Sequence, residues 1–109
     1  GSAAVEELPS APPLVNDPAL VNSMADFVSE LYGEGTVYRL DEGGMGSEDF
    51  ASYTYEMPCA YLLLGAGAEG ENPLFGRPMH NEKVVFNEDV LTKGAAIHAY
   101  CALKWLGET

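Results

Sequence analysis

The chain has 109 residues, and its acidic residues outnumber its basic residues 17 to 5, which gives a formal net charge of -12. This length allows one domain, and the 47% of hydrophobic residues is enough for a core. The acidity argues against nucleic acid as a partner, because phosphate contacts need Lys and Arg, and it disfavours anionic membrane surfaces. Solubility alone explains such a charge. No apolar run approaches the roughly 20 residues that span a bilayer.

The two cysteines, Cys59 and Cys101, lie far apart in the sequence and fit no metal-ligand spacing. Disulfides are rare in reducing compartments. We therefore expect two buried free thiols in a cytoplasmic protein.

The first predicted helix follows an extended lead-in. We interpret Gly1–Ser2 as a vector-derived tag and residues 1–11 as tag and lead-in together, rich in Ala, Pro and Glu. Asp17 followed by Pro18 is a strong helix start, because Asp caps free N–H groups and Pro fits the first helical position. Apolar residues then recur at helical spacing as far as Tyr32, after which glycines end the helix.

Two strands are expected, at residues 36–40 and 59–67. The first is rich in strand formers. Pro58 stops the preceding helix, and the short apolar run after it does not alternate, which is typical of a parallel strand covered on both faces. A helix from its cap Ser47 to about Met57 should join the two strands in a right-handed crossover.

Residues 68–86 contain several Gly and Pro residues and read as a long loop, which in a compact domain is usually functional or disordered. Asn87 should cap a last helix that ends near Gly107. That helix is apolar nearly all round, as buried helices are. The predicted fold class is therefore α/β, in the order α-β-α-β-α with two parallel strands.

Two loops carry the candidate chemistry, and both should leave the sheet at one end if its strands are parallel. Residues 41–50 hold three glycines, which allow close backbone approach to a ligand, and the second loop contains His80. Neutral imidazole is the commonest side-chain metal ligand, but an exposed loop histidine with no role fits the sequence too. Catalytic zinc generally takes three protein ligands, and nothing else here is spaced to complete a site. Helix-dipole complementarity alone explains Glu48 and Asp49, and His98 in mid-helix reads as a packing or surface residue.

Five motifs in this order resemble a known family: P-P-L-V-N-D (12–17), M-G-S-E-D-F (45–50), P-C-A-Y-L-L-L-G-A-G (58–67), M-H-N (79–81) and F-N-E-D-V-L-x-x-G-A-A (86–96). They look like the C-terminal portion of the dimetal amidohydrolases of peptidase family M20, the group of aminoacylases, hippurate hydrolases and auxin-conjugate hydrolases. The resemblance covers residues 12–107.

The resemblance implies a catalytic domain of α/β/α type, interrupted by an inserted lid, with residues 12–107 forming its C-terminal part after the lid. His80 would be the last metal ligand, and Gly46, Ser47 and Glu48 would lie on the wall of the active-site cleft. The family reaction is hydrolysis of the amide in N-acyl amino acids or small peptides. Two metal ions, zinc or manganese, activate a water molecule, and a Glu acts as general base.

The chain also departs from the family pattern. The first ligand motif, the bridging carboxylate and the Glu-Glu pair precede the lid in the family and are absent here. Glu6–Glu7 lies ahead of the first motif and does not take that role, and Cys59 stands where Gly is common. We therefore expect a fragment of the enzyme that is inactive by itself, binds no metal tightly and self-associates to cover a sheet edge. A non-catalytic interaction module and a metal-free small-molecule binder are the alternatives.

Overall fold

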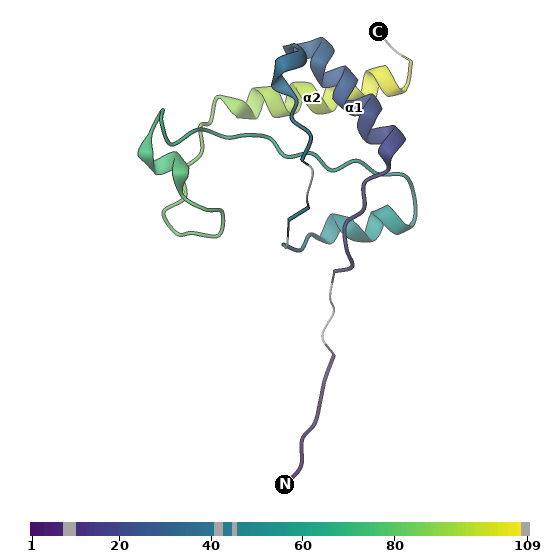
Figure 1. Cartoon of the computed structure of the whole chain (residues 1–109), viewed down its shortest axis with the longest axis vertical. Helices are drawn as coiled ribbons and strands as arrows, with labels where there is room; N and C mark the ends of the chain where they lie inside the picture. The colour runs from purple at the N-terminus through teal and green to yellow at the C-terminus, as the bar shows by residue number, and fades with distance from the viewer. Residues whose placement is uncertain (8–10, 41–42, 45, 108–109) are drawn as a thin grey trace.

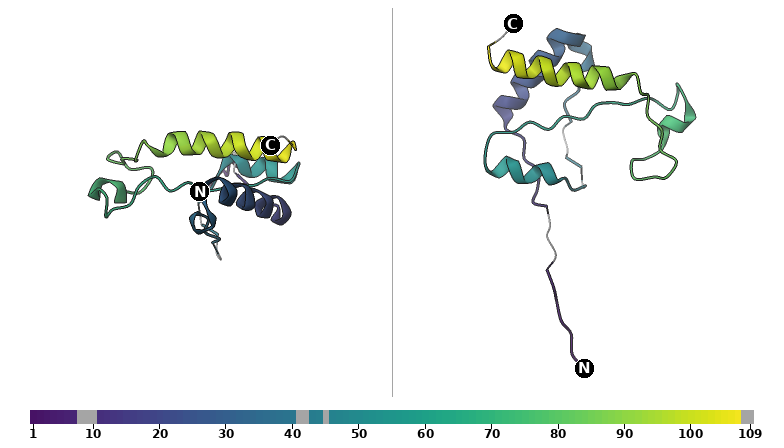
Figure 2. Two further views of the ribbon diagram at one scale, coloured as in Figure 1. Left: turned by 90° about the horizontal axis from the view of Figure 1, so that it is seen from above. Right: turned by 180° about the vertical axis from the view of Figure 1, so that it is seen from behind.

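The computed structural model describes residues 1–7, 11–40, 43–44 and 46–107. Pro9 of the lead-in and Asp41, Glu42 and Met45 of the predicted glycine loop lie outside these residues. Two α-helices cross face to face at one end of the molecule, and the N-terminal lead-in projects from the other end (Figures 1 and 2). The elements are α1 (Pro18–Tyr32), η1 (Glu34–Thr36), η2 (Asp49–Tyr55), η3 (Pro73–Gly76) and α2 (Val90–Trp105), where η marks a 3-10 helix.

Helix α1 has the boundaries that the sequence predicts. The Asp17 carboxylate accepts a hydrogen bond from the Leu20 N–H at 2.8 Å, and Pro18 fills the first helical position. Gly33 ends the helix with a φ of 100°, a conformation that favours glycine. Local signals at both ends are therefore enough to define this helix.

Helix α2 begins later than predicted and is much less buried. The Asn87 side chain accepts from the Asp89 N–H at 3.0 Å, so it forms a turn just ahead of the helix rather than its cap. Of the α2 residues, only Cys101 is buried, while Leu91 and Trp105 are 69% and 61% exposed. Helix α1 covers one face of α2, and the other apolar side chains remain at the surface.

A cluster of polar side chains joins the two helices. The Tyr100 hydroxyl donates to Glu30 Oε2 at 2.8 Å, and Lys104 Nζ lies 3.4 Å from the same oxygen. Lys104 also lies 5.9 Å from the centre of the Phe27 ring, within the range of a cation–π contact. The Tyr100 hydrogen bond lowers the pKa of Glu30, and the same bond raises the pKa of Tyr100.

The segment between the two predicted strands forms η2, a 3-10 helix, where the sequence predicts an α-helix. Glu48 takes the capping position instead of Ser47, and its Oε1 accepts a long hydrogen bond of 3.4 Å from the Phe50 N–H. Residues 49–55 are mostly aromatic, Ser, Thr and Asp, which are modest α-helix formers. Their low α-helix propensity is consistent with a short 3-10 helix in place of an α-helix.

No residue that the structure describes forms a strand. Cys59–Gly67 nevertheless runs as an extended segment close to the helix pair (Figure 1). The α/β arrangement with two parallel strands therefore stays a prediction.

The molecule leaves much of its surface open. Its accessible area is 9064 Å², whereas a compact protein of 11.6 kDa exposes about 5,800 Å². The radius of gyration is 17.6 Å, against about 13 Å for a compact domain of this length. Only small side chains are buried in the described part of the chain, namely Ala25, Ala51, Cys59 and Cys101.

Both cysteines are free and buried, as expected, and burial raises the pKa of the Cys101 thiol. Neither α1 nor α2, nor any other described helix, is long and apolar enough to cross a membrane.

Candidate functional site

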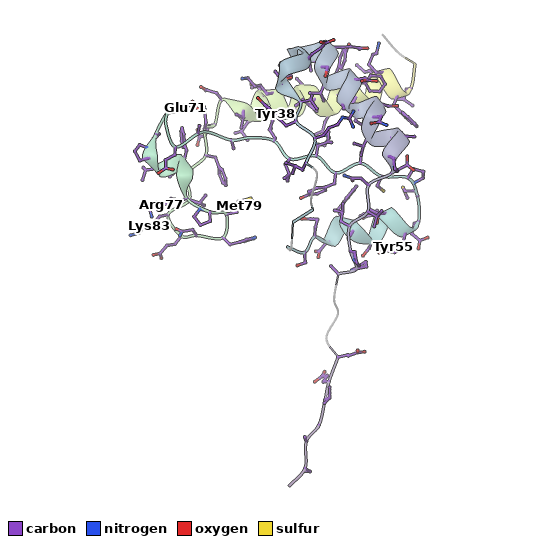
Figure 3. All side chains as sticks on the ribbon, in the orientation of Figure 1. Tyr38, Tyr55, Glu71, Arg77, Met79 and Lys83 are labelled. Carbon is purple, nitrogen blue, oxygen red and sulfur yellow. The ribbon has the colours of Figure 1, made fainter. Side chains whose placement is uncertain are left out.

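The residues singled out from the sequence lie in two separate loops. Gly46, Ser47 and Glu48 precede η2, and His80 follows η3. All four are exposed. Between these two loops, the described residues form no hydrogen bond or ion pair. Figure 3 shows the second loop, with Arg77, Met79 and Lys83 labelled, apart from the helix pair.

The backbone at His80 has an unusual conformation. Its φ is 55°, and it is the one non-glycine residue in the described part of the chain with a positive φ. The left-handed region costs a non-glycine residue on the order of 1 kcal/mol. The next turn is held locally, since the Asn81 side chain accepts from the Lys83 N–H at 2.8 Å and the Asn81 carbonyl accepts from the Val84 N–H at 3.0 Å. Strain of this kind is common at functional positions, so it adds a structural reason to single out His80.

His80 does not make a metal centre with the neighbours seen here. Among the described residues, no three His, Cys, Asp or Glu side chains come together in a group that could hold a metal ion. His98, the other histidine, is exposed on α2. His80 can therefore supply one imidazole ligand, and the further ligands are not provided by the described residues.

Glu48 is held in place by Tyr61, a residue that the sequence analysis did not single out. The Tyr61 hydroxyl donates to Glu48 Oε2 at 3.2 Å, and this bond raises the pKa of Tyr61. The centres of the Phe50 and Tyr61 rings lie 5.6 Å apart with their planes tilted by 37°, so the Tyr61 ring also packs near Phe50. The only signal in the sequence is a tyrosine in an otherwise aliphatic run.

Asn16 bonds to the backbone of Tyr61 as a neighbouring strand would. Its side-chain nitrogen donates to the Tyr61 carbonyl at 3.1 Å, and its side-chain oxygen accepts from the Tyr61 N–H at 2.7 Å. The Asp17 N–H adds a bond to the Cys59 carbonyl at 2.8 Å. These bonds fix residues 16–17 along one edge of the extended segment, and through Tyr61 they position Glu48.

Comparison with known proteins agrees with the motifs. The family model described as Peptidase family M20/M25/M40 matches residues 2–104. The hippurate hydrolase of Campylobacter jejuni is 33% identical over 96 residues, which are 88% of this chain and 23% of that protein. The IAA-amino acid hydrolase ILR1-like 4 of Arabidopsis thaliana is 31% identical, over 94% of this chain and 23% of that protein. Thermostable carboxypeptidase 1 of Saccharolobus solfataricus is 32% identical, over 86% of this chain and 22% of that protein.

The chain thus spans less than a quarter of the length of these curated relatives. No solved structure gives a significant match. The family model nevertheless covers nearly the whole chain, which confirms the family that the five motifs indicate. The chain belongs to peptidase family M20/M25/M40.

Proposed function

We propose that this chain is one part of a metal-dependent amidohydrolase that cleaves N-acyl amino acids or small peptides, and that it supplies the metal ligand His80. The observation that carries the proposal is the family match over residues 2–104, which includes the M-H-N motif around His80. The relatives of this chain include a hippurate hydrolase, an IAA-amino acid hydrolase and a carboxypeptidase. The left-handed backbone of His80 further supports a functional role at this position.

The cleft wall in this proposal is formed by Gly46, Ser47 and Glu48. A divalent metal, zinc or manganese, would supply Lewis-acid activation of the scissile amide when bound. His80 would hold its imidazole toward that metal, and Tyr61 would hold the Glu48 carboxylate at the cleft wall through their 3.2 Å hydrogen bond. The chain by itself should be inactive and should bind zinc only weakly, because a catalytic zinc ion generally needs three protein ligands and His80 is only one.

A graft into a relative tests the role of His80. In the hippurate hydrolase of Campylobacter jejuni, the matching segment is replaced by residues 2–104 of this chain, and hydrolysis of hippurate is measured with added zinc or manganese. His80→Ala should lower turnover by about 100-fold or more, since even partners of metal ligands contribute 10–100-fold. His98→Ala is the matched control and should leave turnover unchanged. Equal losses for both variants, or none for His80→Ala, would contradict the proposal.

The isolated chain gives a second measurement that does not depend on the graft. It should hydrolyse no N-acyl amino acid above background, with or without added metal. Calorimetry should find no tight zinc site. A tight site that is lost with His80→Ala would show that other residues of this chain, such as Glu48 or Glu82, complete the ligand set.

We also propose that copies of the chain self-associate in the cytoplasm. The large exposed area and the exposed side chains of Leu62, Leu63 and Leu64 support this self-association. Two free thiols support the reducing compartment.

A further inference from the structure

The extended segment between Met57 and Ala68 has the properties of an open strand edge. It contains no charged residue. Residues 61–65 are all exposed, and Leu63 reaches 77%. An exposed, apolar, extended segment with unpaired backbone groups is a template for pairing with another strand.

The hydrogen bonds divide this segment into two edges. In an extended chain, the N–H and C=O of one residue point to one edge and those of the next residue to the other. Cys59 and Tyr61 bond to residues 16–17, which therefore occupy the first edge. The Ala66 carbonyl accepts from the Asn87 N–H at 2.8 Å, and it lies on the second edge.

The second edge is open between its two ends. Ala60, Leu62 and Leu64 direct their backbone groups to it, and none of these groups is hydrogen-bonded within the described part of the chain. One end of this window is Pro58, which has no N–H to donate. The other end is Ala66, whose carbonyl is already used.

We propose that a second copy of this chain pairs antiparallel along this edge, with Leu62 opposite Leu62 of the second copy. In this register Ala60 lies opposite Leu64, so three residue pairs exchange both of their backbone hydrogen bonds. Pro58 then lies opposite Ala66, so the two positions that cannot pair meet each other. Side chains directly opposite each other share a face, as a two-fold axis perpendicular to the sheet requires.

Area and charge both allow a second copy as the occupant. The exposed area exceeds that of a compact protein of this mass by about 3,200 Å², while a stable interface needs about 800 Å² from each partner. The nearest charged residues, Glu56 and Glu69, lie opposite Ala68 and Tyr55 in this register, so no two carboxylates face each other. Repulsion between the remaining charges is screened beyond roughly 10 Å at moderate salt.

The inference rests on the proposed self-association and is independent of the proposed hydrolase role. Light scattering on the full chain at high micromolar concentration should give twice the monomer mass.

Leu62→Cys and Leu64→Cys are matched variants, because both leucines are 46% exposed. Opposed Cα atoms lie about 5.5 Å apart in such a pair, within the range that a disulfide bridges. Mild oxidation should therefore cross-link Leu62→Cys into a covalent dimer and leave Leu64→Cys, which faces Ala60 of the second copy, unlinked.

The unmodified chain is the control for cross-links through its two buried cysteines. Circular dichroism of each variant checks that the helices are retained. A monomer at high micromolar concentration would overturn self-association and assign the open edge to a strand from elsewhere in a family enzyme. Equal cross-linking of the two variants would keep the dimer and overturn this register. Neither result bears on His80, which the graft tests separately.

Discussion

The helix pair and the arm from residue 68 to residue 87 hold their shapes by different means. Helices α1 and α2 bury small side chains and share the Glu30–Tyr100–Lys104 cluster. The arm has no buried residue and is held by short-range hydrogen bonds, in which the side chains of Asn72, Asn81 and Asn87 accept from backbone N–H groups two residues ahead. Such bonds define a path for the chain but contribute little net free energy in water. The arm should therefore open locally more readily than the helix pair.

Gly67→Ala should have the largest effect, and it should fall on the arm. Gly67 has a φ of 123°, and a Cβ there would lie 2.7 Å from Phe75 Cδ2 and 3.1 Å from Phe75 Cβ. Backbone strain and the clash together should cost the arm about 2 kcal/mol. Amide exchange of Glu71 and Phe75, whose N–H groups bond within the arm, should accelerate accordingly. Gly65→Ala is the control, because its Cβ would meet nothing within 4 Å. Similar exchange in both variants would show that the Gly67 contact does not hold the arm.

Asp17→Ala should weaken the helix pair by about 1 kcal/mol, the usual contribution of a helix N-cap. The 2.8 Å bond to the Leu20 N–H is lost, while the backbone bond from the Asp17 N–H to Cys59 can remain. Urea unfolding followed by helical circular dichroism measures the change. Asp26→Ala, at an exposed position within α1, should be neutral or slightly stabilising. A loss as large for Asp26→Ala would mean that negative charge, and not capping, is the cause.

A change in pH should have a smaller effect on the stability of the helix pair. The pKa of Glu30 is lowered from 4.5, so its contribution is present above that value and is lost as the pH falls through the folded-state pKa. The pKa of Tyr100 is raised from 10.0, so its contribution is present below that value and is lost as the pH rises through the folded-state pKa. Thermal unfolding should show the helix pair weakening at both extremes. Tyr100→Phe should reduce the loss of stability at both low and high pH. If the pH dependence of thermal unfolding were unchanged in this variant, the Glu30–Tyr100 bond would be excluded as its cause.

The sequence could predict what depends on neighbouring residues. The ends of α1 follow from Asp17–Pro18 and Gly33, whose effects act within one helical turn. The family and the candidate ligand His80 follow from the order of short motifs. The contacts that position Glu48 join residues 13 and 45 positions apart, and no local pattern encodes such pairs. The burial of α2 could not be inferred from its composition, because an apolar helix is covered only where another element reaches it.

The left-handed turn at His80 also bears on how this position changes during evolution. The backbone there favours Gly or Asn, whereas metal ligation favours His. Under the proposed ligand role of His80, local stability and metal binding therefore favour different residues at this position. In a family member that no longer needs the ligand, drift to Gly or Asn would be favoured by the backbone itself. The residue at this position in related sequences should therefore distinguish chains still selected for hydrolysis from chains kept only for their fold.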